Sequence, residues 1–342
     1  MTDFIKIEDF VNERKLCELA LDKECKKLID FAKKDEINSR SFVGNNLIYH
    51  FNFENLIKAR RNKKLSFYDI ITDVNKEEYI KLLNETEKRD RTGTMTKKLY
   101  ECYRVNRGAI VFFKSAQAIL CYKNFNAKKV LDFTMGWGGR LLGAWAMGID
   151  YIGIDCNICM KSSYENMIET LQKYDKKIGR PSPKMEIIWK SCLDVDYSKL
   201  DYDFVLTSPP YYNLEIYECM GKLWAIKDDF YKNFMKKIFN KINDNFDGVF
   251  CLNISPKMFE EFSKYIDEKP IGEIDLKQQL GNQKKKSKDL IYCYRKNSKI
   301  NEERKKNKFN ELIKNAIDYA NMNNINKDEL IKITKNFIEN NM

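Results

Sequence analysis

From about residue 91 onward, the pattern of apolar and polar positions alternates between that of strands and that of helices. Short apolar runs typical of buried strands alternate with longer amphipathic segments typical of helices. The expected strands cover residues 128–133, 151–155, 186–189, 204–206, 248–254 and 290–294, and the expected helices between them cover 140–147, 157–174 and 223–242. Because strands alternate with helices, the pattern predicts an α/β fold with a doubly wound, mostly parallel sheet.

The two ends of the chain show helical patterns without strands between them. The first ninety residues contain amphipathic helical patterns, such as Leu16, Leu19 and Ala20, and almost no Gly or Pro. Residues after about 297 form two Lys-rich amphipathic patterns. We therefore expect a helical N-terminal region (1–90), a central α/β domain (91–297) and a basic helical C-terminal tail (298–342).

Composition and charge narrow the class of protein. No apolar run approaches the ~20 residues that span a bilayer, the first residues resemble no secretory leader, and the 10 cysteines are scattered. These features predict a cytoplasmic protein of a reducing compartment with no membrane partner. The net charge is +11, and residues 281–342 hold 15 Lys or Arg against 8 Asp or Glu. This basic excess indicates a polyanionic partner, or else a solvated tail in a Lys-rich chain.

A double proline follows the expected strand at 204–206. Proline lacks a backbone N–H and has a fixed φ, so the strand must end there in a stiff, extended turn. The segment reads Thr207-Ser208-Pro209-Pro210-Tyr211-Tyr212. A hydroxyl acceptor, a rigid carbonyl and an aromatic face therefore lie side by side, a set that suits a flat ring carrying an amino group.

A glycine-rich loop lies between the first expected strand and helix of the α/β domain. It reads Asp132-Phe133-Thr134-Met135-Gly136-Trp137-Gly138-Gly139. Glycines let such a turn approach a ligand closely, and an acid about 20 residues later takes ribose hydroxyls in doubly wound folds. Asp155, at the end of the second strand, has this spacing. The loop fits neither a dinucleotide fingerprint nor a P-loop, so it predicts another nucleoside-bearing cofactor.

In these motifs and their order, residues 91–296 resemble the S-adenosylmethionine-dependent methyltransferases that act on exocyclic amino groups of nucleic-acid bases. The resemblance is to DNA methyltransferases of the S-P-P-Y type, and it implies a Rossmann-like methyltransferase sheet. It implies S-adenosylmethionine as cofactor, bound by Asp132, Phe133, Thr134, Gly136, Gly138, Asp155 and Asp194. It implies catalytic roles for Ser208, Pro209, Pro210 and Tyr211, and no metal.

The chain departs from the family pattern at one loop position. Thr134 stands where the family usually has Phe, so Trp137 or Phe133 would have to supply a surface for the methionine part of the cofactor. The segment 112–114 could match the family's methionine-binding segment, although core packing is the interpretation that we favour. Cys156-x-x-Cys159 has no partner pair at zinc spacing, so we expect packing cysteines.

The chemistry of amino methylation explains the motif. The Ser208 hydroxyl and the Pro209 carbonyl would accept the amino N–H groups, and Tyr211 would stack on the base. The single histidine, His50, lies outside the expected site, and this chemistry needs no strong general base. The base must leave its duplex or be single-stranded.

Several alternatives stay open on the sequence alone. DNA is the expected partner, with RNA as the nearest alternative and a catalytically silent nucleic-acid-binding subunit as another class. In the family, Ser-first motifs accompany cytosine more often than adenine, so either base fits. Residues 276–288 carry Gln, Asn and Lys side chains that suit nucleic acid, or else form a polar hairpin.

Overall fold

A computed structural model describes most of the chain. The described residues are 6–61, 64–72, 76–89, 92–108, 110–212, 215–216, 226–244, 246–276, 290–296, 313–314 and 331. Residues 277–288, expected either to suit nucleic acid or else to form a polar hairpin, and nearly all of the predicted C-terminal tail lie outside these residues. Within them, no helix is both long and apolar enough to cross a bilayer.

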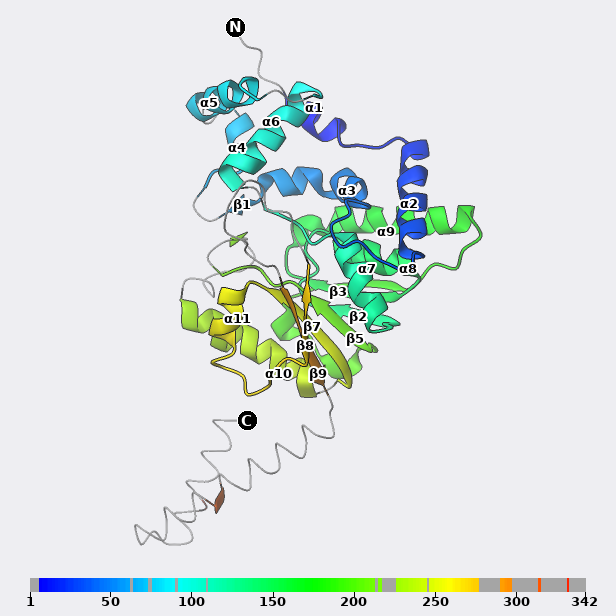
Figure 1. Cartoon of the computed structure of the whole chain (residues 1–342), viewed down its shortest axis with the longest axis vertical. Helices are drawn as coiled ribbons and strands as arrows, with labels where there is room; N and C mark the ends of the chain where they lie inside the picture. The colour runs from blue at the N-terminus through cyan, green and yellow to red at the C-terminus, as the bar shows by residue number, and fades with distance from the viewer. Residues whose placement is uncertain are drawn as a thin grey trace.

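A seven-stranded sheet forms the centre of the molecule, with the order β4-β3-β2-β5-β7-β9-β8 (Figure 1). The strands are β2 (Lys129–Asp132), β3 (Asp150–Asp155), β4 (Met185–Trp189), β5 (Phe204–Thr207), β7 (Gly248–Ile254), β8 (Gly272–Asp275) and β9 (Leu290–Lys296). The first five in this order are parallel, and β9 runs antiparallel to both of its neighbours. The order reverses between β2 and β5, which is the switch point of a doubly wound sheet.

Helices cover both faces of the sheet, which explains the continuous apolar runs of its strands. One face packs against α7 (Ser115–Asn124), α8 (Gly139–Met147) and α9 (Lys161–Lys177). The other face packs against η7 (Asp229–Lys236), α10 (Lys237–Asp244) and α11 (Pro256–Phe262). The doubly wound, mostly parallel sheet expected from the sequence is confirmed.

Most expected elements are found, with corrected boundaries. The helix expected at 157–174 opens with a 3-10 turn (Ile158–Met160) and continues as α9 to Lys177. The single helix expected at 223–242 is, over its described part, a π-helical segment η7 followed by α10. Strand β8 was not expected, because its side chains lie on an edge and are mostly exposed, which leaves no apolar alternation to detect.

The N-terminal region consists of α1 (Ile7–Asn12), α2 (Glu18–Ala32), α3 (Asn45–Lys58), α4 (Phe67–Ile71) and α5 (Lys76–Glu87), followed by α6 (Met95–Tyr103). Its hydrophobic packing is not separated at the predicted boundary after residue 90. Leu28 and Ile48 belong to the core against the sheet, whereas Tyr100 joins Phe10 and Phe67 in a second core among the N-terminal helices. The domain division therefore stays a prediction.

A small two-stranded sheet joins distant parts of the chain. β1 (Arg60–Arg61) pairs antiparallel with β6 (Glu215–Ile216), with Arg60 opposite Ile216 and Arg61 opposite Glu215. The N-terminal region is thus connected to the segment that closely follows the double-proline motif.

Candidate active site

The two predicted motifs lie side by side at the carboxyl edge of the sheet. Asp132 ends β2 and Thr207 ends β5, and these strands are neighbours. The hydroxyl oxygens of Thr134 and Thr207 are 2.6 Å apart, and the Thr207 hydroxyl donates to Asp132 Oδ1 at 3.3 Å. The glycine loop and the double-proline turn are therefore joined directly at the switch point of the sheet, where doubly wound folds bind ligands.

The Asp132 carboxylate is occupied by donors from the protein itself. Arg140 Nε donates to Oδ2 at 2.5 Å and the Tyr151 hydroxyl at 2.7 Å, while the Thr134 amide donates to Oδ1 at 3.3 Å. Burial disfavours the Arg140 cation, but the neighbouring Asp132 charge outweighs this and raises the pKa of Arg140. Because both carboxylate oxygens are engaged, Asp132 holds the loop in shape, and its predicted contact with a cofactor stays a prediction.

Close packing requires glycine at position 139 of this loop, and a positive φ favours glycine at position 136. A Cβ on Gly139 would lie 1.9 Å from the Phe113 carbonyl oxygen, so no side chain fits there. Gly136 has a φ of 57°, and the nearest atoms to a Cβ at that position are 3.8 Å away. The Tyr164 hydroxyl donates to the carbonyl oxygen of Gly136 at 2.8 Å. The Gly136 backbone is therefore fixed from one side and has room on the other.

Asp155 stands beside the loop at the end of β3, as the sequence predicted for the ribose-binding acid. Its Oδ2 accepts from the Gly136 amide at 3.2 Å and its Oδ1 from the Asn157 amide at 2.9 Å. Burial raises the pKa of Asp155 above its ordinary value, although these two backbone hydrogen bonds oppose the shift. Each oxygen retains a lone pair, so the carboxylate can still accept two hydroxyl groups.

Asp194 lies at the same edge of the sheet but apart from the other acids. It ends a 3-10 turn (Cys192–Asp194) that follows β4, and it is exposed. Burial, together with the nearby Cys156 and Asp155, raises the pKa of the Cys192 thiol to about 12, so this turn does adjoin the Asp155 carboxylate. The predicted contact of Asp194 with a cofactor stays a prediction.

A hydrogen-bond chain that the sequence analysis missed fixes the proton of Ser208. Asn253, near the end of β7 and 5% exposed, donates from Nδ2 to the Leu290 carbonyl at 3.0 Å. Because a carbonyl only accepts, the Asn253 amide oxygen must point the other way, toward the Ser208 hydroxyl at 3.0 Å. Ser208 therefore donates its proton to Asn253 and presents its lone pairs to any group in the site.

The other residues of the motif, Pro209 to Tyr212, are buried or partly buried. Pro209 is buried, and Pro210 and Tyr211 are partly exposed. Tyr212 packs into the core next to Phe230, with ring centroids 5.4 Å apart. Tyr211 and Tyr212 are both partly exposed, and both pack against the core on this face of the sheet, which anchors the motif from behind.

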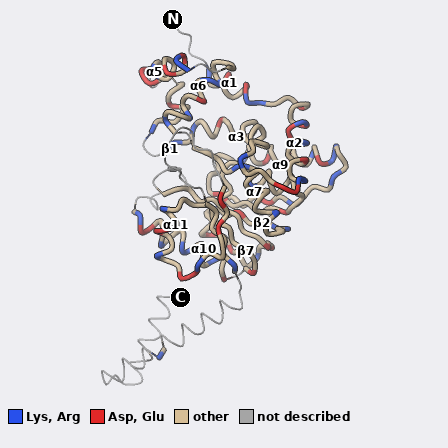
Figure 2. Tube along the Cα trace, viewed as in Figure 1, with Lys and Arg blue, Asp and Glu red and all other residues tan. Residues whose placement is uncertain are grey.

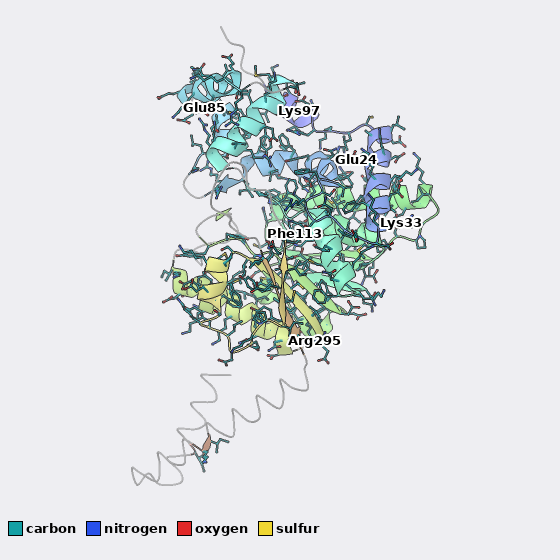
Figure 3. All side chains as sticks on the ribbon, viewed as in Figure 1. Glu24, Lys33, Glu85, Lys97, Phe113 and Arg295 are labelled. Atoms are coloured by element: carbon teal, nitrogen blue, oxygen red, sulfur yellow. The ribbon has the colours of Figure 1, made fainter. Side chains whose placement is uncertain are left out.

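The phenylalanines near the loop, Phe112, Phe113 and Phe133, differ in how deeply they are buried. The predicted contact of Phe133 with a cofactor stays a prediction. Its side chain is 2% exposed and packs toward Phe250. The cause is strand alternation, which turns Phe133 into the core opposite α8. Phe112 is buried as expected, whereas Phe113, labelled in Figure 3, is only partly buried. The centroid of the Phe113 ring is 5.3 Å from the Arg140 guanidinium carbon.

The donor set fits a nucleoside-bearing cofactor and offers no evident metal site. The Asp155 carboxylate and the Gly136 backbone, where a Cβ would meet no atom closer than 3.8 Å, are the kinds of group that bind ribose and polar chains. Cys156 is partly exposed and Cys159 is exposed. Over the described part of the chain, His, Cys, Asp and Glu side chains nowhere gather in a group that could hold a metal ion.

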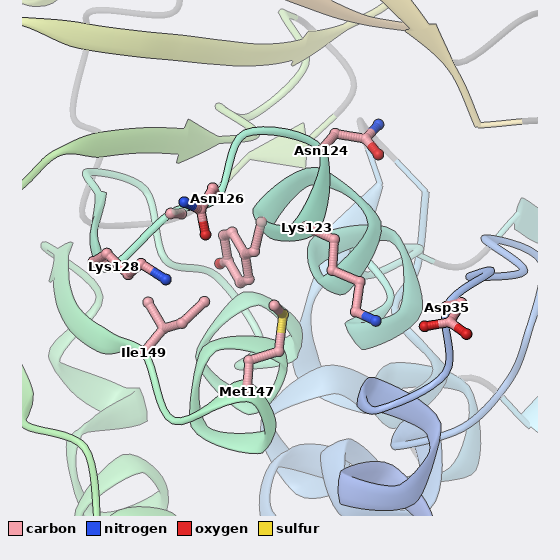
Figure 4. Close-up of a pocket in the computed structure, with 9 residues that line it drawn as sticks. Asp35, Lys123, Asn124, Asn126, Lys128, Met147 and Ile149 are labelled. Carbon is pink, nitrogen blue, oxygen red and sulfur yellow. The ribbon is translucent and has the colours of Figure 1, made fainter.

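A surface pocket of about 480 Å³ lies at the opposite edge of the sheet (Figure 4). Lys128 and Ile149, which immediately precede β2 and β3, line this pocket. Lys123 of α7 and Met147 of α8 line it as well. It therefore opens at the amino ends of the strands, whereas the predicted site residues gather at their carboxyl ends. We assign it no part in the site.

Comparison with known proteins gives only structural neighbours. No family model and no curated protein matches the sequence. Among solved structures, TehB from Haemophilus influenzae is 15% identical over 58% of this chain and 66% of its own, with a TM-score of 0.32. An rRNA methylase from Streptococcus thermophilus is 15% identical over 50% of this chain and 87% of its own, with a TM-score of 0.31. The N-methyltransferase NodS from Bradyrhizobium japonicum is 9% identical over 53% of this chain and 93% of its own, with a TM-score of 0.33.

These similarities are too distant to carry an argument about activity. The assignment of the fold depends instead on the strand order, on the switch point between β2 and β5, and on the glycine loop that links β2 to α8. Together these features define a doubly wound, Rossmann-like α/β protein, a fold in which ligands bind at the carboxyl edge of the sheet.

Proposed function

We propose that this protein transfers a methyl group from S-adenosylmethionine to an exocyclic amino nitrogen of a base in DNA. The observation that carries the proposal is the contact between Thr134 and Thr207, which joins the glycine loop to the Ser208–Tyr211 motif. A cofactor turn and an amino-binding turn that meet at one switch point suit direct transfer between two bound molecules, because alignment supplies much of the rate.

The cofactor would be held by the loop and by Asp155. S-adenosylmethionine, when bound, supplies an electrophilic methyl group. Asp155 would accept the ribose hydroxyls, and the open backbone at Gly136 would border the amino-acid part. Asp194 belongs to the turn after β4, whose Cys192 is near Asp155, and from this turn it would face the adenine end. Asp132 and Arg140 would act indirectly, by keeping the loop in its bound shape before the ligand arrives.

Ser208 and Pro209 would bind the amino group of the target base. The lone pair of such a nitrogen is delocalised into the ring, so the site must accept the N–H groups and turn that lone pair outward. Asn253 takes the Ser208 proton, which leaves the Ser208 oxygen as an acceptor. The Pro209 carbonyl would be the second acceptor. Tyr211 would stack on the base, a contact worth about 1–3 kcal/mol.

Mass spectrometry of nucleosides tests the proposal. Duplex DNA, single-stranded DNA and RNA are incubated with the protein and isotopically labelled S-adenosylmethionine, and methylated cytidine and adenosine species are separated. We expect label on an amino nitrogen of DNA, and its loss in Ser208→Ala. Ser263→Ala is the matched control, because that exposed serine bonds only to its own helix.

Three outcomes would contradict different parts of the proposal. Label on RNA alone would replace the substrate. Equal labelling by Ser208→Ala and the wild type would refute the assignment of the site. An absence of label, together with calorimetry that detects no binding of S-adenosylhomocysteine, would refute the activity itself.

A further inference from the structure

The segment that leaves the double-proline motif is fastened to the N-terminal region. Tyr211 and Glu215 are four positions apart, which is at most about 14 Å of extended chain. Glu215 pairs with Arg61 across the β1–β6 ladder, and paired strands lie about 5 Å apart. The Arg61 backbone is therefore within about 19 Å of Tyr211, the length of about six base pairs of DNA.

The chain around β1 is strongly basic. Residues 58–64 read K-A-R-R-N-K-K, with five cations and no acid. Figure 2 shows blue segments beside the β1 label. Lys58 and Arg60 have acidic partners, because Lys58 Nζ is 2.8 Å from Glu54 and Arg60 Nη2 is 2.9 Å from Asp69. The Arg60 side chain nevertheless remains 60% exposed, so it can still contact an anion.

Two further cations, Arg61 in β1 and Lys64 after it, have no acidic partner among the described ion pairs. Arg61 Nη1 donates to the Gly108 carbonyl at 3.4 Å, and Lys64 Nζ donates to the Arg107 carbonyl at 3.0 Å. These carbonyls end the π-helical segment η2 (Arg104–Gly108) that continues α6. The two side chains are thus positioned by neutral groups, and Arg61 lies opposite Glu215 in the β1–β6 ladder.

The scaffold beneath these cations is well ordered by its own contacts. Arg107 Nη1 lies 2.6 Å from Glu85, and Arg107 Nη2 lies 3.4 Å from Glu78, which fastens η2 to α5. On the other side, Ser66 and Asp69 form a reciprocal capping box at the start of α4. The cations therefore project from a fixed platform, so binding an anion there requires little further ordering.

We propose that Lys58, Arg60, Arg61 and Lys64, here named the β1 strip, bind the phosphates of DNA next to the target base. This inference depends on the function proposed above and identifies the N-terminal region as the surface that docks the substrate. The strip lies a few base pairs from the amino-binding turn, the distance at which backbone contacts set the position of a base. Phosphate contacts fix position and carry no sequence information, so the strip would bind all DNA sequences about equally.

Salt-dependent binding to a fluorescent 20-base-pair duplex tests the strip. The variant Arg61→Gln/Lys64→Gln removes the two cations without an acidic partner and keeps their length. Each lost phosphate contact lowers the slope of log K against log salt by about 0.9, so we expect a decrease of about 1.8. Affinity near 100 mM salt should fall at least about tenfold, while the affinity for S-adenosylhomocysteine stays unchanged.

The matched control is Lys173→Gln/Lys176→Gln in the last turns of α9, where both lysines are exposed. It should keep the wild-type salt slope. An unchanged slope and affinity in the β1-strip variant would overturn the proposal, as would displacement of the duplex by polyglutamate at equal charge concentration. If the strip variant loses duplex binding but the wild type methylates nothing, the docking surface stands and the proposed activity fails.

Discussion

The buried pair Asp132–Arg140 allows a sharp test of how the glycine loop is held. The side chains are 0% and 4% exposed, with Arg140 Nε 2.5 Å from Asp132 Oδ2. Asp132→Asn removes the countercharge from a fully desolvated guanidinium, and breaking such a pair costs about 3–5 kcal/mol. Arg140→Met should cost nearer 3 kcal/mol, because Tyr151 and Thr207 still donate to the remaining carboxylate.

The double variant makes the prediction specific to the pair. Asp132→Asn with Arg140→Met leaves no buried net charge, so its cost should be less than the sum of the single costs by about 1–3 kcal/mol. Equilibrium unfolding in urea, followed by circular dichroism, measures all three differences. A constant m-value would show that the variants unfold from comparably compact states.

An exposed ion pair supplies the control. Lys173 and Glu169 in α9 are 2.6 Å apart, but their side chains are 74% and 64% exposed. Neutralising either should change the unfolding free energy by less than about 1 kcal/mol. If the costs at Asp132 and Arg140 add to within about 0.5 kcal/mol, or match those in α9, the pair does not hold the loop and the argument is refuted.

Three further predictions concern the site and its supports. Asp155→Asn should weaken binding of S-adenosylhomocysteine by about 10–100-fold. The wild-type affinity should decrease as the pH is lowered, because the raised pKa of Asp155 favours protonation of its carboxylate. An unchanged dissociation constant in calorimetry would contradict both expectations. Burial and the nearby Lys15 lower the pKa of His50 to about 4 in the folded protein. The free energy of unfolding should therefore decrease by about 1 kcal/mol, after allowance for partial exposure, as the pH falls from about 6.5 toward 4. His50→Gln should lose less stability over this range in urea titrations, and an equal pH dependence would contradict the prediction. Gly139→Ala should cost at least about 3 kcal/mol because its Cβ meets the Phe113 carbonyl, whereas Gly272→Ala, with open space around it, should be nearly neutral in the same assay.

Local sequence signals predicted the elements that border the site. The strand from Lys129 to Asp132 has the adjacent apolar residues Val130 and Leu131, one on each face, and Gly148, with a φ of 72°, caps α8 directly after the helix predicted at 140–147. The double proline ends β5 because proline cannot continue a ladder. Such features depend on a few neighbouring residues, so a single sequence is enough to detect them.

Polar residues within apolar segments were a signal that sequence analysis did not use. Arg140 lies in the otherwise apolar helix α8, and Asn253 lies in the apolar strand β7. A buried polar group requires a partner, so each marks a hydrogen-bond network. The identity of those partners, Asp132 and Ser208, could not be predicted, because it depends on which strands and turns become neighbours.

The sequence by itself determined the alternation of strands and helices, the turn types and the chemical groups available at the end of each strand. Periodicity, glycine conformations and proline geometry are local properties, so they need no knowledge of the fold. Only the tertiary structure decided that Thr134 meets Thr207, that Asn253 orients Ser208, and that β1 pairs with β6. These contacts join residues tens to more than a hundred positions apart. The first two form because burying both faces of one sheet brings its strand ends together, and the third forms in a separate two-stranded sheet.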